Sequence, residues 1–207
     1  MRRSSIIIFL LFLVHCMNGQ HAYKRPVFFS PGQNFLALQP APLPVTHHQL
    51  VVIAHRGSHL DVPENTLTAY SNAIKEGADY VEIDLRTTKD GHLVIMHNES
   101  VTKMTGEKGL VKDLSYSEIR DFKIKAVGNE DATIYRVPDF ASVLNLCKGK
   151  INIYLDFKDA NVEKAYRLIK EAGMEHHVVV YLNKEEQYGQ WRKVAPHIPL
   201  MASLPEN

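Results

Sequence analysis

A chain of 207 residues is long enough for one domain with a sizeable core and short for two. Its 24 basic residues nearly balance its 23 acidic ones, and a formal charge of +1 gives no overall attraction to nucleic acid or to an anionic membrane. We therefore expect no nucleic-acid partner, and any recognition of an anion has to depend on a local group of residues.

Residues 1–19 are predicted to be a signal peptide. Arg2 and Arg3 precede an apolar run over residues 6–14, which has the length of a signal-peptide core and is too short to span a bilayer. We expect an exported protein, secreted or periplasmic, without a membrane span. Cys16 leaves a second interpretation open, in which the mature chain carries a lipid anchor at this residue.

The rest of the chain is predicted to be a proline-rich linker over residues 20–49 and one domain over residues 50–207. Apolar periodicity within the domain predicts alternating strands and helices. The expected strands span residues 50–54, 80–86, 93–96, 151–157, 178–182 and 200–203. The expected helices span residues 66–76, 140–146, 162–172 and 184–195, and a capping-box sequence at residues 115–118 opens another. Cys147 fits the apolar stripe of its helix, so we expect a buried thiol.

Such alternation is typical of a parallel sheet with helical crossovers, in either an open doubly wound sheet or a (β/α)8 barrel. Two strands favour the barrel, because each has one apolar face and one charged face. One charged face carries Glu82, Asp84 and Arg86, and another carries Asp156 and Lys158. Inside a barrel these faces end at the mouth, where barrel active sites lie. No dinucleotide-type glycine fingerprint follows a strand, which argues against the open sheet.

Three carboxylates at the strand ends indicate a metal site. Glu82 and Asp84 come from one strand and Asp156 from another, and together they would form an oxygen cage suited to Mg²⁺ or Ca²⁺. The alternative for Glu82 and Asp84 is an exposed edge face. What favours the metal site is that further charged groups are expected at the same end of successive parallel strands.

These further groups are two histidines and two cations. His55 and His97 follow separate strands and could act as general base and general acid. Arg56 and Lys158 could hold an anion whose charge the metal shares, although an arginine here could also be a simple salt-bridge partner. A metal, two cations and two imidazoles together indicate cleavage of a phosphate ester.

The motifs that carry these residues resemble the glycerophosphodiester phosphodiesterase family. They are His-Arg-Gly at 55–57, Pro-Glu-Asn-Thr at 63–66, Glu-x-Asp at 82–84, His97, and Asp-Phe-Lys at 156–158. The resemblance implies a (β/α)8 TIM barrel of the PLC-like phosphodiesterase type. It also implies metal-dependent hydrolysis of glycerophosphodiesters to an alcohol and sn-glycerol 3-phosphate.

Carried over residue by residue, the resemblance makes Glu82, Asp84 and Asp156 the metal ligands and the two histidines the acid/base pair. It makes Arg56 and Lys158 the phosphate contacts, with Glu64 a nearby carboxylate of the substrate site. Residues 98–135 correspond to a small insert that helps to cover the substrate.

Three positions depart from the family pattern: Asn98, where Asp is usual, Lys103, which replaces an Arg, and Asp156, where Glu is more frequent. The first two bear on substrate positioning more than on the metal. A further departure concerns length, since a barrel of this kind typically runs to ~250 residues. We therefore expect a barrel that is incomplete at its C-terminus, after about six strands.

The incomplete barrel keeps two other functions open. One is a non-catalytic remnant or headgroup-binding protein, and the other is a related phosphodiesterase that acts on lysophospholipid-type diesters. The sequence gives no indication of the oligomeric state.

Overall fold

The computed structural model describes residues 42–124 and 133–203. The predicted signal peptide, Cys16 and most of the predicted linker lie outside these residues. Five parallel strands form the main sheet in the order β1, β2, β6, β7, β8. Their bounds are Ile53–Ala54 for β1, Tyr80–Thr87 for β2, Asn152–Phe157 for β6, Val178–Leu182 for β7 and Leu200–Ala202 for β8.

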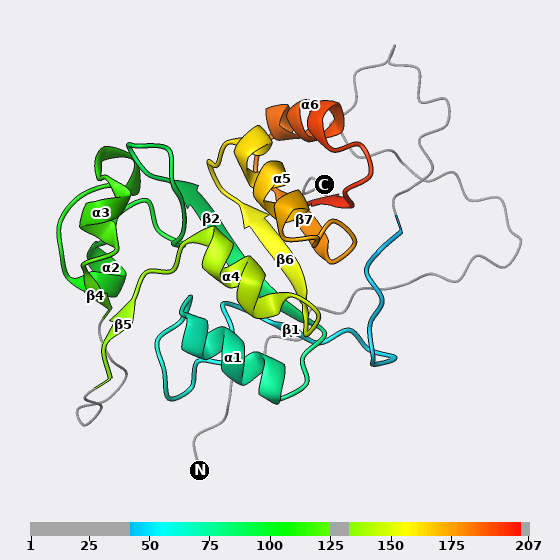
Figure 1. Ribbon diagram of the computed structural model, residues 1–207, viewed down its shortest axis with the longest axis horizontal. Helices are drawn as coiled ribbons and strands as arrows, with labels where there is room; N and C mark the ends of the chain where they lie inside the picture. Colours follow the sequence, from blue (N-terminus) through cyan, green and yellow to red (C-terminus); the bar gives the residue numbers. More distant parts are fainter. Residues whose placement is uncertain (1–41, 125–132, 204–207) are drawn as a thin grey trace, which may run out of the picture.

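Four helices lie on one face of this sheet (Figure 1). They are α1 (Leu67–Lys75), α4 (Phe140–Cys147), α5 (Val162–Glu171) and α6 (Glu185–Val194). The first three begin where a side-chain oxygen accepts a hydrogen bond from a free backbone N–H, at Thr66, Asp139 and Asn161. Parallel strands with helices outside them are the repeating unit of the (β/α)8 barrel, and the predicted fold class is confirmed.

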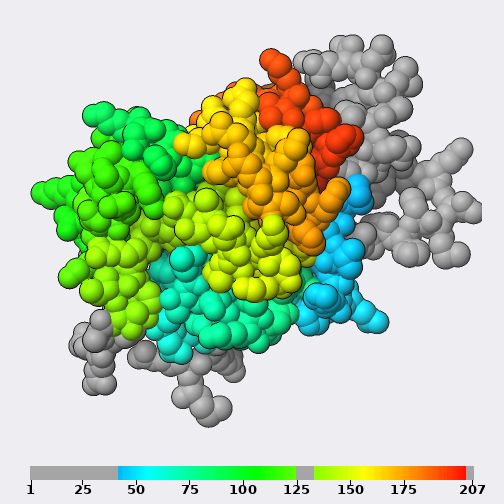
Figure 2. Space-filling view, in the orientation of Figure 1, coloured from blue at the N-terminus to red at the C-terminus, as the bar shows by residue number. Residues whose placement is uncertain are grey.

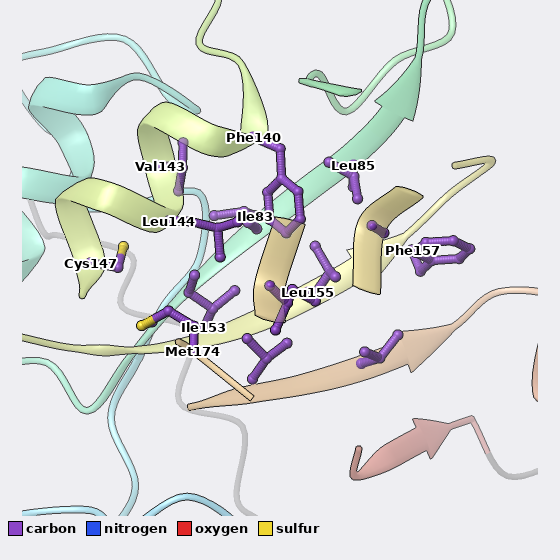
Figure 3. Packing of buried hydrophobic residues seen from close by; sticks show 14 of the residues in the cluster. Ile83, Leu85, Phe140, Val143, Leu144, Cys147, Ile153, Leu155, Phe157 and Met174 are labelled. Atoms are coloured by element: carbon purple, nitrogen blue, oxygen red, sulfur yellow. The ribbon is translucent and has the colours of Figure 1, made fainter. Parts of the chain in front are cut away.

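The core lies between the sheet and these helices, and strand alternation decides which residues enter it. Figure 3 shows apolar side chains of α4 directed at those of β2 and β6. The buried residues of this interface include Ile83, Leu85, Phe140, Val143, Leu144, Ile153, Leu155 and Phe157. Cys147 is fully buried there, as expected, and burial raises the pKa of its thiol to about 12. The opposite face of the sheet carries the polar residues of β2 and β6, among them Glu82, Asp84 and Asp156.

Strand β3 (Leu93–Ile95) corrects one expectation, because it pairs with β2 in the antiparallel sense. The physical reason is the length of the connection. Residues 88–92 form a tight turn, in which the Thr88 N–H donates to the His92 carbonyl, whereas a parallel crossover needs a dozen or more residues. The charged strand ends therefore do not all belong to successive parallel strands.

The predicted insert forms a separate small lobe beside the sheet, seen in green at the left of Figure 2. Its elements are α2 (Thr102–Thr105), the 3₁₀ turn η1 (Val111–Asp113), α3 (Tyr116–Ile119), β4 (Lys123–Ile124) and β5 (Tyr135–Arg136). The predicted capping box at Ser115 opens α3. A second hydrophobic cluster, including Val101, Met104 and Ile119, holds the lobe together. Residues 125–132 of the predicted insert lie outside the described part of the chain.

Residues 42–52 run across the N-terminal end of the sheet, where buried Asp79 holds them. Its carboxylate accepts hydrogen bonds from the backbone N–H groups of His47 and Val52, at 2.8 and 2.9 Å, and lies 2.9 Å from His48 Nδ1. Burial alone would raise the pKa of Asp79, but these hydrogen bonds outweigh it and lower the pKa below its ordinary value. This end of the sheet is therefore closed by polar contacts.

No strand within residues 42–124 and 133–203 joins β1 to β8, so the sheet is open at these two edges. In the same residues, no helix combines the length and the apolar character needed to cross a bilayer.

Candidate active site

Three carboxylates meet at the C-terminal end of the central strands, and we call Glu82, Asp84 and Asp156 the acidic cluster. Asp84 and Asp156 are register partners on β2 and β6, so their side chains leave the same face of the sheet side by side. One oxygen from each residue of the cluster lies within 4.8 Å of the others. Glu82 and Asp84 are buried, and Asp156 is partly exposed. The sequence prediction that these three side chains converge is confirmed.

Two cations contact the acidic cluster. Arg56 Nε lies 3.4 Å from Asp84 Oδ2, and its Nη1 donates to both carboxylate oxygens of Glu64, at 3.1 and 3.2 Å. Lys158 Nζ lies 3.2 Å from Asp84 Oδ1 and also donates to Asp156. Burial disfavours the charged lysine, but the neighbouring carboxylates outweigh this effect and raise the pKa of Lys158 above its ordinary value.

The acidic cluster and Glu64 bring four carboxylates against the two cations Arg56 and Lys158. A divalent cation would offset negative charge at this site. Burial first, and then the charge of Asp84, raise the pKa of Glu82 to about 8. Asp84 Oδ1 is buried and accepts no hydrogen bond of good geometry. A site of carboxylate oxygens, one of which is buried without a hydrogen-bond donor, fits a hard cation such as Ca²⁺ or Mg²⁺.

The end of β1 turns sharply to place Arg56 at the cluster. Arg56 has a φ of +57° and Gly57 a φ of +84°, both in the left-handed region. The Arg56 N–H donates to Glu82 Oε2 at 2.9 Å. A side chain at position 57 would lie 2.7 Å from the backbone carbon of Ala69 in α1, so only glycine fits. The His-Arg-Gly motif therefore encodes a turn as well as chemical groups.

The two histidines follow β1 and β3. Partial burial and the charge of Arg56 lower the pKa of His55, against an opposing effect of Asp84. His97 is partly buried, and its Nδ1 lies 3.1 Å from Asn98 Oδ1. The Met96 N–H beside it donates to the Asp84 carbonyl at 2.9 Å, which brings the end of β3 against the cluster strand.

The model of the glycerophosphoryl diester phosphodiesterase family matches residues 55–196, well over half of the chain. The chain belongs to this family. A glycerophosphodiester phosphodiesterase of Caldanaerobacter subterraneus is 34% identical over 157 residues, covering 72% of this chain and 65% of that protein. Human glycerophosphodiester phosphodiesterase 1 is 34% identical over 156 residues, covering 73% of this chain and 45% of the human protein.

Solved structures of the family have the same fold. The crystal structure of the glycerophosphodiester phosphodiesterase of Agrobacterium tumefaciens superposes with a TM-score of 0.66 at 30% identity, covering 72% of this chain and 64% of that one. An Oleispira antarctica phosphodiesterase, solved in complex with the product sn-glycerol-3-phosphate, has a TM-score of 0.61 at 20% identity and shares the fold. The chain spans slightly less than two thirds of the first of these curated relatives.

The small lobe beside the sheet reaches the site through α2. Lys103 Nζ lies 3.6 Å from Glu64 Oε1, on the carboxylate that also binds Arg56. The side chain of Lys103 is largely exposed. The lobe therefore contributes a third, solvent-facing cation beside Glu64.

Two asparagines that the sequence did not assign to the site support the acidic cluster. Buried Asn65 donates to Asp84 Oδ2 at 2.9 Å and accepts from the Tyr70 hydroxyl at 2.7 Å, while Thr66 beside it caps α1. Asn183, after β7, donates to Asp156 Oδ1 at 2.5 Å. The Pro-Glu-Asn-Thr motif contains a signal for Asn65, whereas nothing in the local sequence marks Asn183.

Proposed function

We propose that this protein hydrolyses glycerophosphodiesters to an alcohol and sn-glycerol 3-phosphate. The observation that carries the proposal is the acidic cluster, whose ligand oxygens lie within 4.8 Å of one another beside Arg56 and Lys158. Membership of the family and the names of the related enzymes support it.

We propose that the acidic cluster holds one divalent cation, Ca²⁺ or Mg²⁺. Oxygens on opposite sides of a bound Ca²⁺ are roughly 5 Å apart, which agrees with the spread of the three carboxylates. When bound, the cation would stabilise negative charge on the phosphoryl oxygens. Asn65 and Asn183 would keep two of its ligands, Asp84 and Asp156, in place.

The remaining polar residues of the site have two proposed roles: the two cations bind the substrate, and the two histidines transfer protons. Arg56 and Lys158 would turn from the carboxylates to the substrate phosphate, each as a charge-assisted donor. The lowered pKa of His55 favours its neutral imidazole, which can take a proton from the attacking hydroxyl or water. His97 would then give a proton to the leaving alcohol. If the glycerol hydroxyl is the attacking group, this leaves a cyclic phosphate, which water must open to give sn-glycerol 3-phosphate.

The direct test is hydrolysis of glycerophosphocholine by the full chain with Ca²⁺, Mg²⁺ or a chelator. We expect release of sn-glycerol 3-phosphate with at least one of the two ions and none with the chelator. Equal release under all three conditions would contradict the proposed metal requirement. Absence of release under every condition would contradict the proposed hydrolase activity. Lysophospholipid substrates in the same assay decide between the two substrate classes.

The open sheet favours one other candidate, a non-catalytic headgroup-binding protein, because the described strands do not close around the site. Calorimetric binding of sn-glycerol 3-phosphate to the metal-loaded chain, without turnover of the diester, would support this candidate against hydrolysis.

We also propose that the protein is exported, from the signal-like sequence of residues 1–19. Mass spectrometry of the mature protein tests this. A new N-terminus near residue 19 supports secretion, a lipid mass on Cys16 supports an anchored form, and an unprocessed Met1 contradicts both.

A further inference from the structure

Arg86 lies on the same face of β2 as Glu82 and Asp84, and the proposed reaction gives it no role. Its side chain is only 9% exposed. Its guanidinium contacts neither the acidic cluster nor Glu64 in any hydrogen bond or ion pair among the described residues, in contrast to Arg56 and Lys158. It is directed instead at the backbone that carries His97.

The contacts of Arg86 form a clamp on the end of β3. Nη2 donates to the His97 carbonyl at 2.7 Å, and Nε donates to the carbonyls of His97 and Met96 at 3.1 and 3.2 Å. The β2–β3 ladder pairs residues only as far as Ile95. Because His97 lies beyond the paired residues, the guanidinium supplies the donors that its carbonyl would otherwise lack.

The same guanidinium also reaches the loop after β6. Nη1 donates to Asp159 Oδ2 at 2.5 Å, and Asp159 directly follows Lys158. One buried side chain thus connects the strand of the acidic cluster with the backbone of one histidine and with the residue next to one cation. A planar fork with several fixed donors can make these contacts at once, and an ammonium group cannot.

We propose that Arg86 is a positioning residue. It fixes the position of His97 relative to the acidic cluster, and it links the His97 backbone to the loop that follows Lys158. The proposal rests on the proposed role of His97 in proton transfer. It predicts that loss of the fork moves the imidazole while leaving the metal ligands in place.

The first experiment reads the imidazoles directly, in the full chain labelled with ¹³C and ¹⁵N at histidine. His97→Ala and His55→Ala assign the two ring signals. We expect Arg86→Met to shift or broaden the His97 signals and to leave those of His55 unchanged. Arg86→Lys, which keeps the charge without the planar fork, serves if Arg86→Met does not fold, and we expect the same change. Unchanged His97 signals in a folded variant would overturn the proposal, whether or not the chain is active.

A matched control is Arg192, which donates to the carbonyls of Pro196 and Ile198 beyond the end of α6, at 2.8 and 3.1 Å. Arg192→Met removes a clamp of the same chemistry away from the site. We expect it to change neither histidine signal. If it moved the His97 signals as much as Arg86→Met does, the effect of Arg86 would be general loosening and the proposal would fail.

Kinetics on glycerophosphocholine give the second readout. Arg86→Lys should lower kcat by about 10- to 100-fold, the range for residues that orient a functional group, with KM nearly unchanged. In a His97→Ala background the same substitution should have little further effect, because both changes remove one interaction. An equal further loss in that background, or a raised KM with normal kcat, would overturn the proposal. Absence of turnover in the wild-type chain would refute the hydrolase, and the histidine signals would still decide the role of Arg86.

Discussion

Residues at the start of this site have to meet two requirements: a side chain of the right chemistry and a backbone conformation that few residues adopt. Arg56 presents its guanidinium from a left-handed residue, and Gly57 beside it fits only because it has no Cβ. Asp84 is fully buried and contacts Arg56, Lys158 and Asn65. At this scale the expected effect of a substitution depends on whether it removes the group or moves it.

Replacing either histidine removes a group. His55→Ala and His97→Ala should each lower kcat on glycerophosphocholine by about 10²- to 10⁴-fold, the usual contribution of a general acid or base. Calcium affinity, measured by calorimetry, should not change, because neither residue is a proposed ligand. His176→Ala, at an exposed position, is the matched control. A wild-type rate in both single variants would refute the proposed acid/base pair.

Gly57→Ala moves groups without removing one. Gly57 and Gly91 have nearly the same φ, +84° and +78°, but a Cβ at 91 meets nothing within 4 Å. Each substitution should cost roughly 1–2 kcal/mol of unfolding free energy for the left-handed backbone. Gly57→Ala should cost more and also lower kcat, since the turn at residue 57 and α1 must move apart to relieve the contact with Ala69. Equal urea midpoints for the two variants would show that the close approach to α1 has no energetic weight.

At the scale of elements, the sequence predicts what alternation and spacing determine. Strands β2 and β6 and the apolar stripes of α4 and α5 follow from local patterns, so their faces, and with them the acidic cluster, could be predicted. The direction of β3 could also have been derived, because residues 88–92 are too short for a crossover. The contacts of Arg86 and Asn183 could not, since each depends on distant parts of the chain.

The element that crosses the N-terminal end of the sheet gives a pH-dependent prediction. The carboxylate of Asp79 is fully buried, and its folded-state pKa lies below its ordinary value of 3.8. A depressed pKa contributes stability above the unfolded-state pKa, and this contribution is lost as the pH falls through the folded-state pKa. Asp79→Asn should therefore lower the free energy of unfolding by about 1–3 kcal/mol at pH 7, from lost and unsatisfied hydrogen bonds.

The measurement is urea unfolding of wild type and Asp79→Asn at pH 7 and at pH 3. The difference between the two proteins should shrink at the lower pH, because pH 3 lies below the ordinary pKa of 3.8, so the unfolded wild-type carboxyl is mostly protonated and folding has to release that proton. Asp61→Asn, at an exposed carboxylate, should show no difference at either pH. A constant difference across this range would mean that hydrogen bonds to Asp79 do not depend on its charge.

For the whole molecule, the acidic cluster lies where the two central strands of the sheet meet. Strands β2 and β6 share the longest register of the main sheet, and the cluster places like charges on both of them. Burial first, and then the charge of Asp84, raise the pKa of Glu82, so its charged form is disfavoured in this arrangement. A bound divalent ion would therefore stabilise the fold as well as the site, because it binds the native cluster and not the separated carboxylates of the unfolded chain.

The expected result is a rise in the unfolding temperature with Ca²⁺ or Mg²⁺. At a free ion concentration of a hundred times its Kd, the gain is about 2.7 kcal/mol, or a rise of roughly 5–10 °C for a chain of this size. Asp84→Asn, which takes a charged oxygen from the cluster, should abolish most of this rise, whereas Asp61→Asn should keep it. A chelator should reverse the rise in the wild type. If Asp84→Asn gained as much from the ion as the wild type does, the cation would have to bind elsewhere, and the acidic cluster would be a group of structural carboxylates held by Arg56 and Lys158.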